Sequence, residues 1–366
     1  MTTTPAHDAG SDGPTLPEGP ATLPEGQAGL PDGPALWAKT GRPLPEPELL
    51  RPTLDPALPA YVPSGRMRGH LRGTATDVLP FLVERWAGAF RRHHPDVTID
   101  VPPPYGGSPG AKRLTGGDAD FSLQSRELKP SDLEAFTRTF GYGPLLVPIS
   151  GGSWRHYGFL DALTVVVHRD NPLARITYAE IDAIFSRTRF RGHVPIRTWA
   201  ELGLAGTRGA APVNAWAPKP WNGYEEFVRQ RVLSVGDRRG EWRDDIGFAD
   251  LVIPIAGHVA ADPNAIGYTG MAFLNDGVRS IAIAERDEGP FVPPSQEDVA
   301  AGRYPLSRVF YIVANRAPGS ALDPLLLEFM RFILSREGQR EIVDHGVFNP
   351  LRADQLRASR TLIDAT

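Results

Sequence analysis

Hydrophobic residues follow two different periods along this chain from residue 66 onward. Short apolar runs rich in β-branched residues, which are typical of strands, alternate with segments whose apolar residues recur at helical spacing. A helix is expected from near Asp77, where Val78, Leu82, Trp86 and Phe90 share one face. Strands are expected at residues 66–72, 97–101, 119–123, 163–168, 265–268, 281–284 and 309–313. This alternation predicts an α/β fold with mostly parallel sheets.

Capping signals mark three further helix starts. Ser131 and Thr177 each have a glutamate three residues later, which is the capping-box pattern, and Ser108 followed by Pro109 has the pattern of an N-cap with proline at the first helical position. Other helices are expected at 223–233 and, as one long helix, at 323–343. The segment 188–222 is rich in Gly, Pro and Trp and is expected to be irregular.

The first 62 residues have a different composition, rich in Pro and Gly and poor in large apolar side chains. A Leu-Pro-acid-Gly motif starts at Leu16 and recurs every seven residues, at Leu23 and Leu30. Pro and Gly in every repeat exclude a coiled coil. We therefore predict a disordered tether, with a partner-binding segment as the alternative.

Composition narrows the classes of protein that this chain can be. A length of 366 residues exceeds the usual single hydrophobic core, so two lobes are expected. The net charge of −4 argues against nucleic acid as the main partner. The chain has no cysteine, which excludes disulfides, thiolate catalysis and cysteine-based metal sites. No stretch has the length and apolarity of a membrane span, and the first residues lack the basic and apolar regions of a secretory signal.

Three short stretches share a design suited to anions. Residues 73–77 (GTATD), 106–110 (GGSPG) and 124–126 (QSR) each follow an expected strand and lead towards an expected helix. Free backbone N–H groups at a helix start, with hydroxyls beside them, form an anion site, and Arg126 adds a guanidinium. Because ligands of α/β sheets lie beyond the carboxyl ends of the strands, these turns predict a cleft that closes around a small oxyanion. The alternatives are that Thr76 and Ser108 only cap helices and that Arg126 pairs with Asp120 or Glu127.

Six groups of motifs, in a fixed order, carry a resemblance to a known family. They are residues 86–90 (WAGAF) with 94–97, 116–121 (GGDADF) with 125–128 (SREL), 161–163 with 167–173, 265–268 (AIGY), 304–308 (YPLSR) and 334–339 (LSREGQ). From about Tyr61 to Leu351 the chain resembles the phosphate-binding, substrate-capturing proteins of phosphate ABC transporters. The resemblance implies a two-lobed periplasmic-binding-protein fold of type II that closes about a hinge. It places the first lobe at about 66–163 plus 308–351 and the second at 164–307.

The resemblance also implies which residues bind the ligand. Relatives carry an arginine and then Ser-Gly-Thr at the start of a second-lobe helix, whereas this chain has Asn222, Gly223 and Tyr224 there and Lys219 as the nearest cation. A guanidinium in the first lobe suits an oxyanion because it makes bidentate, charge-assisted hydrogen bonds. The expected ligand-binding residues are Thr74, Ala75, Thr76, Ser108, Ser125, Arg126, Lys219, Asn222, Gly223 and Tyr224.

The function implied by the resemblance is binding without catalysis. The chain is expected to capture inorganic phosphate and deliver it to an ABC transporter permease, as a monomer in the periplasm or at the cell surface. No cofactor, metal ion, catalytic residue or nucleic acid is expected. One alternative keeps the fold and binds another oxyanion, an organic phosphate or a small carboxylate, using Trp216, Trp221 and Tyr224. Further alternatives are a sensor or interaction module and a phosphoester hydrolase.

Overall fold

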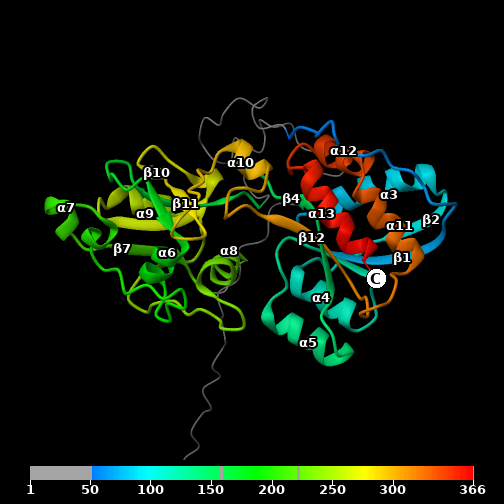
Figure 1. The fold of residues 1–366 in the computed structure, drawn as a ribbon, viewed down its shortest axis with the longest axis horizontal. Helices are drawn as coiled ribbons and strands as arrows, with labels where there is room; N and C mark the ends of the chain where they lie inside the picture. Colours follow the sequence, from blue (N-terminus) through cyan, green and yellow to red (C-terminus); the bar gives the residue numbers. More distant parts are fainter. Residues whose placement is uncertain (1–51, 157–159, 221–222, 366) are drawn as a thin grey trace, which may run out of the picture.

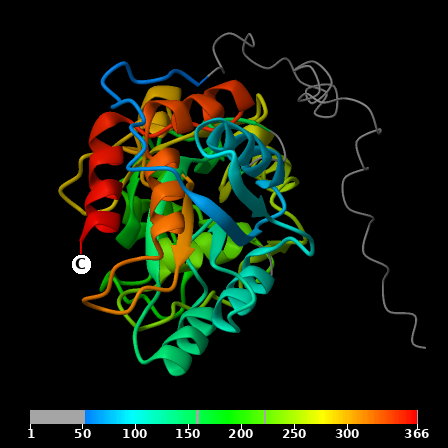
Figure 2. The ribbon, with the colours of Figure 1, turned by 90° about the vertical axis from the view of Figure 1, so that its right-hand side faces the viewer.

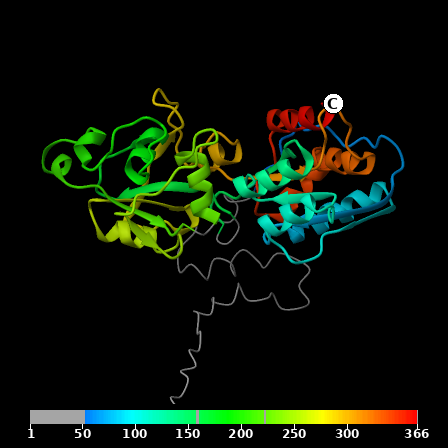
Figure 3. The same ribbon diagram turned by 90° about the horizontal axis from the view of Figure 1, so that it is seen from below.

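Two lobes, each built around a five-stranded sheet, lie side by side in the computed structural model (Figures 1 and 3). The structure describes residues 52–156, 160–220 and 223–365. Most of the predicted N-terminal tether, residues 1–51, and the predicted site residue Asn222 lie outside the described residues. The two-lobed α/β fold expected from the sequence is confirmed.

The first sheet has the strand order β2-β1-β3-β12-β4. Strand β1 pairs in parallel with β2 and β3, whereas β12 runs antiparallel to β3 and β4. The sheet is therefore more mixed than expected. Its strands are β1 (Arg68–Ala75), β2 (Asp96–Asp100), β3 (Phe121–Gln124), β4 (Leu145–Gly151) and β12 (Val309–Ala314).

The second sheet has the order β10-β5-β9-β7-β8 and is also mixed, since β7 is parallel to β8 and β9 while β5 is antiparallel to β9 and β10. Its strand β7 lies within the segment that was expected to be irregular. The predicted strand at 281–284 is present but pairs in a separate small sheet with β6. The strands are β5 (Leu163–His168), β6 (Arg175–Thr177), β7 (Asn214–Pro218), β8 (Gly247–Ala249), β9 (Ala265–Gly270), β10 (Val278–Ser280) and β11 (Ala282–Ala284).

The helices of the first lobe enclose a core that includes Trp86, Phe90, Phe121 and Phe329. The expected long helix is in fact two helices, because the Ser335 side chain accepts a hydrogen bond from the Gly338 N–H and caps a new start. The helices are α3 (Pro80–His93), α4 (Gly107–Thr115), α5 (Pro130–Phe140), α11 (Pro324–Ile333), α12 (Arg336–His345) and α13 (Ala353–Asp364).

The second lobe has its own core, around Phe185, Trp199, Trp242 and Tyr268. The capping box predicted at Thr177 is confirmed at the start of α6. The expected helix at 223–233 is an α-helical segment, α8, that continues as the π-helix η3. The helices are α6 (Tyr178–Phe185), η2 (Trp199–Leu202), α7 (Gly206–Ala210), α8 (Gly223–Val228), η3 (Arg229–Leu233), α9 (Ile255–Ala261), η4 (Met271–Phe273) and α10 (Gln296–Ala300).

Two predicted caps are wrong. Helix α4 is preceded by Gly106 at φ 144°, a backbone conformation that favours glycine, so the helix starts at Gly107 and Ser108 lies inside its first turn. Helix α5 starts at Pro130, and Ser131 likewise lies inside its first turn. In both helices a glycine or proline fixes the start before the serine is reached.

The packed part of the first lobe extends beyond the predicted bounds at both ends (Figure 2). Before residue 62, Leu58 and Tyr61 are buried in the core, and the Tyr61 hydroxyl donates to Glu328 Oε1 at 2.6 Å. The Arg336 N–H donates to the Pro59 carbonyl oxygen at 2.8 Å. After residue 351, helix α13 adds Leu356 to the same core. Residues 55–61 therefore form a strap across α11 and α12.

Two chain segments connect the lobes, one after β4 and one before β12. They are bonded to each other, because the Gly152 N–H donates to the Arg308 carbonyl oxygen at 2.8 Å. A Cβ atom on Gly152 would lie 2.6 Å from the Arg308 Cβ and 2.7 Å from the Leu160 carbonyl oxygen. Only glycine lets the two crossings approach this closely.

Candidate functional site

The three predicted anion turns meet at one edge of the first sheet. The Thr76 N–H donates to the Leu123 carbonyl oxygen at 3.0 Å, and the Gly106 N–H donates to the Ala75 carbonyl oxygen at 2.9 Å. The Gln124 side-chain amide donates to the Gly107 carbonyl oxygen at 3.0 Å. These hydrogen bonds link the end of β1, the start of α4 and the end of β3, so residues that are distant in the sequence share one site.

The two threonines of the first turn have different surroundings. Thr74 is fully buried, and its hydroxyl donates to the Ser122 hydroxyl at 2.8 Å across the β1–β3 pair. Thr76 is also buried, yet its hydroxyl oxygen has no hydrogen-bond partner among the described residues. Because a buried polar atom is normally satisfied, the Thr76 hydroxyl is the one in this turn that still has unused hydrogen-bonding capacity. Ala75 lies between them and contributes backbone.

The second turn is the start of α4. Ser108 donates from its hydroxyl to Asp132 Oδ2 at 2.8 Å, which ties α4 to α5. Gly110 brings α4 close to the sheet, since a Cβ atom there would lie 2.8 Å from both the Thr74 and Ser122 hydroxyl oxygens. In the first helical turn only Gly107 and Ser108 have N–H groups without an intrahelical acceptor, because Pro109 has no N–H and the Gly110 N–H donates to the Gly106 carbonyl oxygen at 3.0 Å. They lie at the positive end of the helix dipole.

Arg126 is the charged group of the third turn and is 9% exposed, beside the half-buried Ser125. Its Nη1 donates to the Glu127 carbonyl oxygen at 2.7 Å, and its Nη2 lies 3.2 Å from where a Cβ atom of Gly107 would be. The guanidinium therefore lies beside the start of α4. Burial lowers the pKa of Arg126, and the negative charges of Asp132, Glu226 and Glu127 oppose that shift.

The second-lobe residues are arranged differently. Lys219 is exposed and pairs with Asp250, Nζ to Oδ1, at 2.5 Å. Gly223 is the first residue of α8, and Tyr224 donates from its hydroxyl to Asp161 Oδ1 at 3.1 Å. The structure therefore brings Tyr224 to the crossing between the lobes and leaves Lys219 in a surface ion pair.

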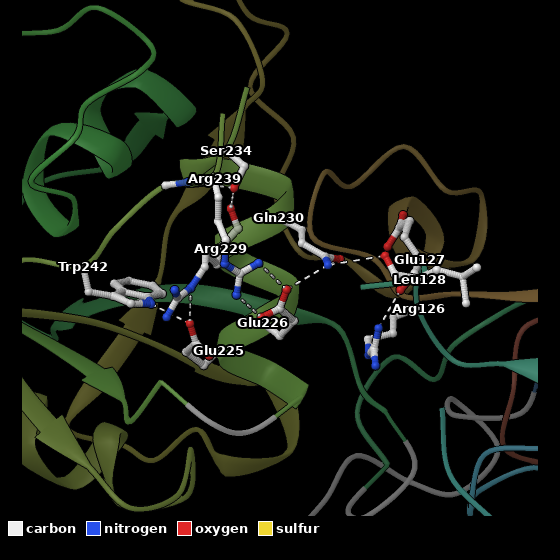
Figure 4. Close-up of polar contacts among 11 residues, drawn as sticks. Arg126, Glu127, Leu128, Glu225, Glu226, Arg229, Gln230, Ser234, Arg239 and Trp242 are labelled. Carbon is white, nitrogen blue, oxygen red and sulfur yellow. Dashed lines mark hydrogen bonds and ion pairs between the residues drawn. The ribbon is translucent and has the colours of Figure 1, made fainter. Parts of the chain in front are cut away.

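Two buried glutamates follow on α8 and hold arginines of their own lobe (Figure 4). Glu226 accepts hydrogen bonds from Arg239 at 2.9 and 2.7 Å, and Glu225 accepts from Arg229 and from the Trp242 ring nitrogen, each at 2.6 Å. Burial, the largest single influence, acts to raise the pKa of Glu226, but Arg239, Arg229 and Arg126 together bring that pKa below its usual value. Glu226 therefore carries a negative charge at neutral pH.

Direct contacts between the lobes lie beside this cluster (Figure 4). The Gln230 side-chain amide of η3 is 3.5 Å from the Leu128 carbonyl oxygen of the first lobe. Arg231 Nη1 pairs with Glu127 Oε1 at 3.2 Å, and the same oxygen accepts from the Tyr311 hydroxyl at 2.9 Å. The turn that carries Arg126 is thus joined to the second lobe.

A second buried arginine near this turn was not singled out from the sequence. Arg308, on the crossing before β12, is 2% exposed, and its guanidinium carbon lies 4.2 Å from the ring centroid of Phe227. The only sequence signal was its place in the YPLSR motif that carried the family resemblance. Composition and periodicity give no sign that this charge would be buried.

Other classes of site find no support in the part of the chain that the structure covers. The described residues contain no group of three or more acidic, His or Cys side chains placed to hold a metal ion. No helix among them combines the length and the apolarity needed to cross a membrane. Trp216, which was considered for stacking on a ring-bearing ligand, stacks instead on His258 at 4.0 Å between ring centroids.

Comparisons with known proteins agree with the family resemblance found in the sequence. A model of the PBP superfamily domain matches residues 62–337. The phosphate-binding protein PstS of Pseudomonas aeruginosa is 34% identical over 301 residues, which cover 82% of this chain and 88% of that protein.

Two solved structures share the fold at low sequence identity. An ABC-type phosphate transport receptor from Vibrio cholerae matches 77% of this chain and all of that chain, with a TM-score of 0.51 and 18% identity. PstS from Borrelia burgdorferi matches 78% of this chain and all of that chain, with a TM-score of 0.54 and 15% identity. These two structures show the fold alone. The matches of sequence place the chain in the PBP superfamily, in the family of the phosphate-binding proteins PstS.

Proposed function

We propose that this protein captures inorganic phosphate between its two lobes and delivers it to the permease of an ABC transporter. The observation that carries the proposal is the convergence of three turns around the buried guanidinium of Arg126. The Gly107 and Ser108 N–H groups at the start of α4, the Thr76 hydroxyl and the guanidinium suit a small anion with several acceptor oxygens. The names of the relatives support phosphate as that anion.

The binding residues proposed in the first lobe are Thr76, the backbone around Ala75 and Ser108, Ser125 and Arg126. The bond from the Thr74 hydroxyl to Ser122 fixes the end of β1 against β3 and so positions Thr76. In the second lobe, Gly223 and Tyr224 on α8, together with Asn222, are proposed to complete the site when the lobes close. The proposal includes no catalytic step. It places the protein in the periplasm or at the cell surface, as a monomer that meets the permease with its ligand bound.

Calorimetric titration with phosphate, on protein freed of bound ligand by unfolding and refolding, tests the proposal. We expect a saturable heat with a dissociation constant in the micromolar range or below, and a rise in melting temperature with phosphate concentration. Sulfate, an organic phosphate and a small carboxylate form the comparison panel. Absence of both heat and thermal stabilisation at millimolar phosphate would refute phosphate as the ligand, and a larger response to another member of the panel would name its replacement.

A further inference from the structure

The buried guanidinium of Arg308 packs on two aromatic rings, and no carboxylate of the described residues forms an ion pair with it. Its backbone is fixed on the crossing by the bond to Gly152. Its side chain lies over the rings of Phe227, at 4.2 Å, and Tyr224, at 5.6 Å, both on α8 of the second lobe. The ring faces stabilise the positive charge but leave the N–H groups free, because a ring face accepts no conventional hydrogen bond.

Two nitrogens of this guanidinium are buried without a partner. Nε and Nη1 of Arg308 make no hydrogen bond within the described residues. Arg243, which is buried to a similar degree, shows the usual arrangement: Nε and Nη2 donate to the Asp245 carboxylate at 2.8 and 2.7 Å, and Nη1 donates to the Ile184 carbonyl oxygen at 2.7 Å. A buried charge without such partners is unfavourable unless something else supplies them.

The charges around Arg308 show where the missing partner belongs. Burial lowers the pKa of Arg308, the negative charges of Glu127 and Asp161 oppose this, and the positive charge of Arg126 adds to it. The antiparallel register of β3 and β12, in which Tyr311 lies opposite Gln124, puts the residues that follow β3 and those that precede β12 at the same end of the sheet, so Arg126 and Arg308 lie on neighbouring strand ends. An anion between two guanidiniums removes the repulsion between their charges and accepts from both.

We propose that Arg308 is a second anion-binding arginine of this site, and that the bound oxyanion accepts hydrogen bonds from its Nε and Nη1 while it contacts Arg126. The inference rests on the proposed function and extends it. Two guanidiniums favour a tetrahedral dianion over a singly charged carboxylate. Because Arg308 stacks on α8, the anion also becomes linked to the second lobe through Phe227 and Tyr224, in the lobe whose Lys219 is already paired with Asp250.

Titration of phosphate into Arg308→Gln and wild-type protein, both freed of ligand, tests the inference. We expect the affinity of Arg308→Gln to fall about 10- to 100-fold, the effect of one or more charge-assisted bonds. We also expect the ligand-free variant to melt at the same temperature as wild type or higher, because an unpartnered buried charge has been removed. Arg243→Gln is the matched control: it should lower the melting temperature and leave phosphate affinity within about 3-fold.

The results of these titrations distinguish the role of Arg308 from the proposed function, phosphate binding. If wild type binds phosphate and Arg308→Gln binds it equally well, the inference is wrong and the proposed function stands. If wild type does not bind phosphate, the inference and the proposed function are both wrong. Should Arg308→Gln fail to fold, Arg308→Lys decides. That variant keeps the charge and loses the planar fork, so an affinity loss of about 5-fold or more supports the inference, and unchanged affinity overturns it.

Discussion

The two lobes differ in whether the positively charged side chains near the candidate site are paired with carboxylates. In the first lobe, Arg126 is buried at a junction of three turns and faces the start of α4, with backbone N–H groups beside it. In the second lobe, the cations near the start of α8 are bonded to carboxylates of the same lobe: Lys219 to Asp250, Arg239 to Glu226 and Arg229 to Glu225. Under the proposed function, the first lobe supplies the unpaired charge that holds the anion, and the second lobe adds Tyr224 when the lobes close.

Removal of the first-lobe guanidinium should have the largest effect on phosphate binding. We expect Arg126→Ala to weaken phosphate binding by about 100-fold or more, because at least two charge-assisted hydrogen bonds are lost from a buried site. Calorimetric titration measures it. Arg138→Ala, which removes an exposed arginine of α5 in the same lobe, should leave affinity unchanged. Equal affinities in the two variants would mean that the first lobe is not the anion-holding half.

The close approach of α4 to the sheet offers the next largest effect. We expect Gly110→Ala to lower the free energy of unfolding by about 1–3 kcal/mol, since its Cβ would lie 2.8 Å from the Thr74 and Ser122 hydroxyl oxygens. Urea denaturation measures this. Gly88→Ala in α3 is the control, because a Cβ there meets nothing within 4 Å and should stabilise the helix by about 0.5–1 kcal/mol. Matching results would show that α4 tolerates displacement and that its start is not fixed against the turns.

Neutralising one buried carboxylate of the second lobe should increase the affinity of the protein for phosphate. We expect Glu226→Gln to raise phosphate affinity about 3-fold, because its negative charge acts on Arg126 and opposes an incoming anion. Titration at low ionic strength, where screening is weakest, gives the clearest measurement. Glu241→Gln, which alters an exposed glutamate paired with Arg187, should change nothing. A loss of affinity in Glu226→Gln would show that the acidic cluster supports binding.

The smallest effect is expected at Lys219. Its pair with Asp250 is exposed, so Lys219→Ala should change affinity by less than about 3-fold and stability by less than about 1 kcal/mol. Titration and thermal unfolding measure the two quantities. A 100-fold loss of affinity would show that Lys219 binds the ligand and that the second lobe also supplies a cation to the site.

Helices and strands were predicted correctly where residues close together in the sequence determine the backbone conformation. The strand expected at residues 66–72 is present as β1, which runs three residues further, to Ala75, and the capping box at Thr177 is present too. The helix starts at Ser108 and Ser131 were misplaced because Gly106 and Pro130 act earlier in the chain. Strand β7 was missed because it ends in Pro218 and lies among glycines and prolines, and its pairing with β8 and β9 is a long-range effect.

The site was only partly predictable for a related reason. Sequence patterns place Thr76 and Arg126 at turn positions, since turn chemistry is local. They do not show that the Thr74 hydroxyl is bonded to Ser122 while the Thr76 hydroxyl is free, because that depends on the register between β1 and β3. Nor do they show that Arg308 is buried against Phe227, which lies some eighty residues earlier in the chain.

The strap formed by residues 55–61 has a mechanical consequence. It leads from the Pro/Gly-rich start of the chain onto α11 and α12, where the Tyr61 hydroxyl donates to Glu328 and also lies 2.7 Å from Nε2 of His94, at the end of α3. A force applied through the N-terminus would therefore load buried side chains of three helices before it reached the edge of β1. A pull on the chain before residue 55 would thus be resisted by these buried contacts, and the sheet that carries the three turns would stay intact.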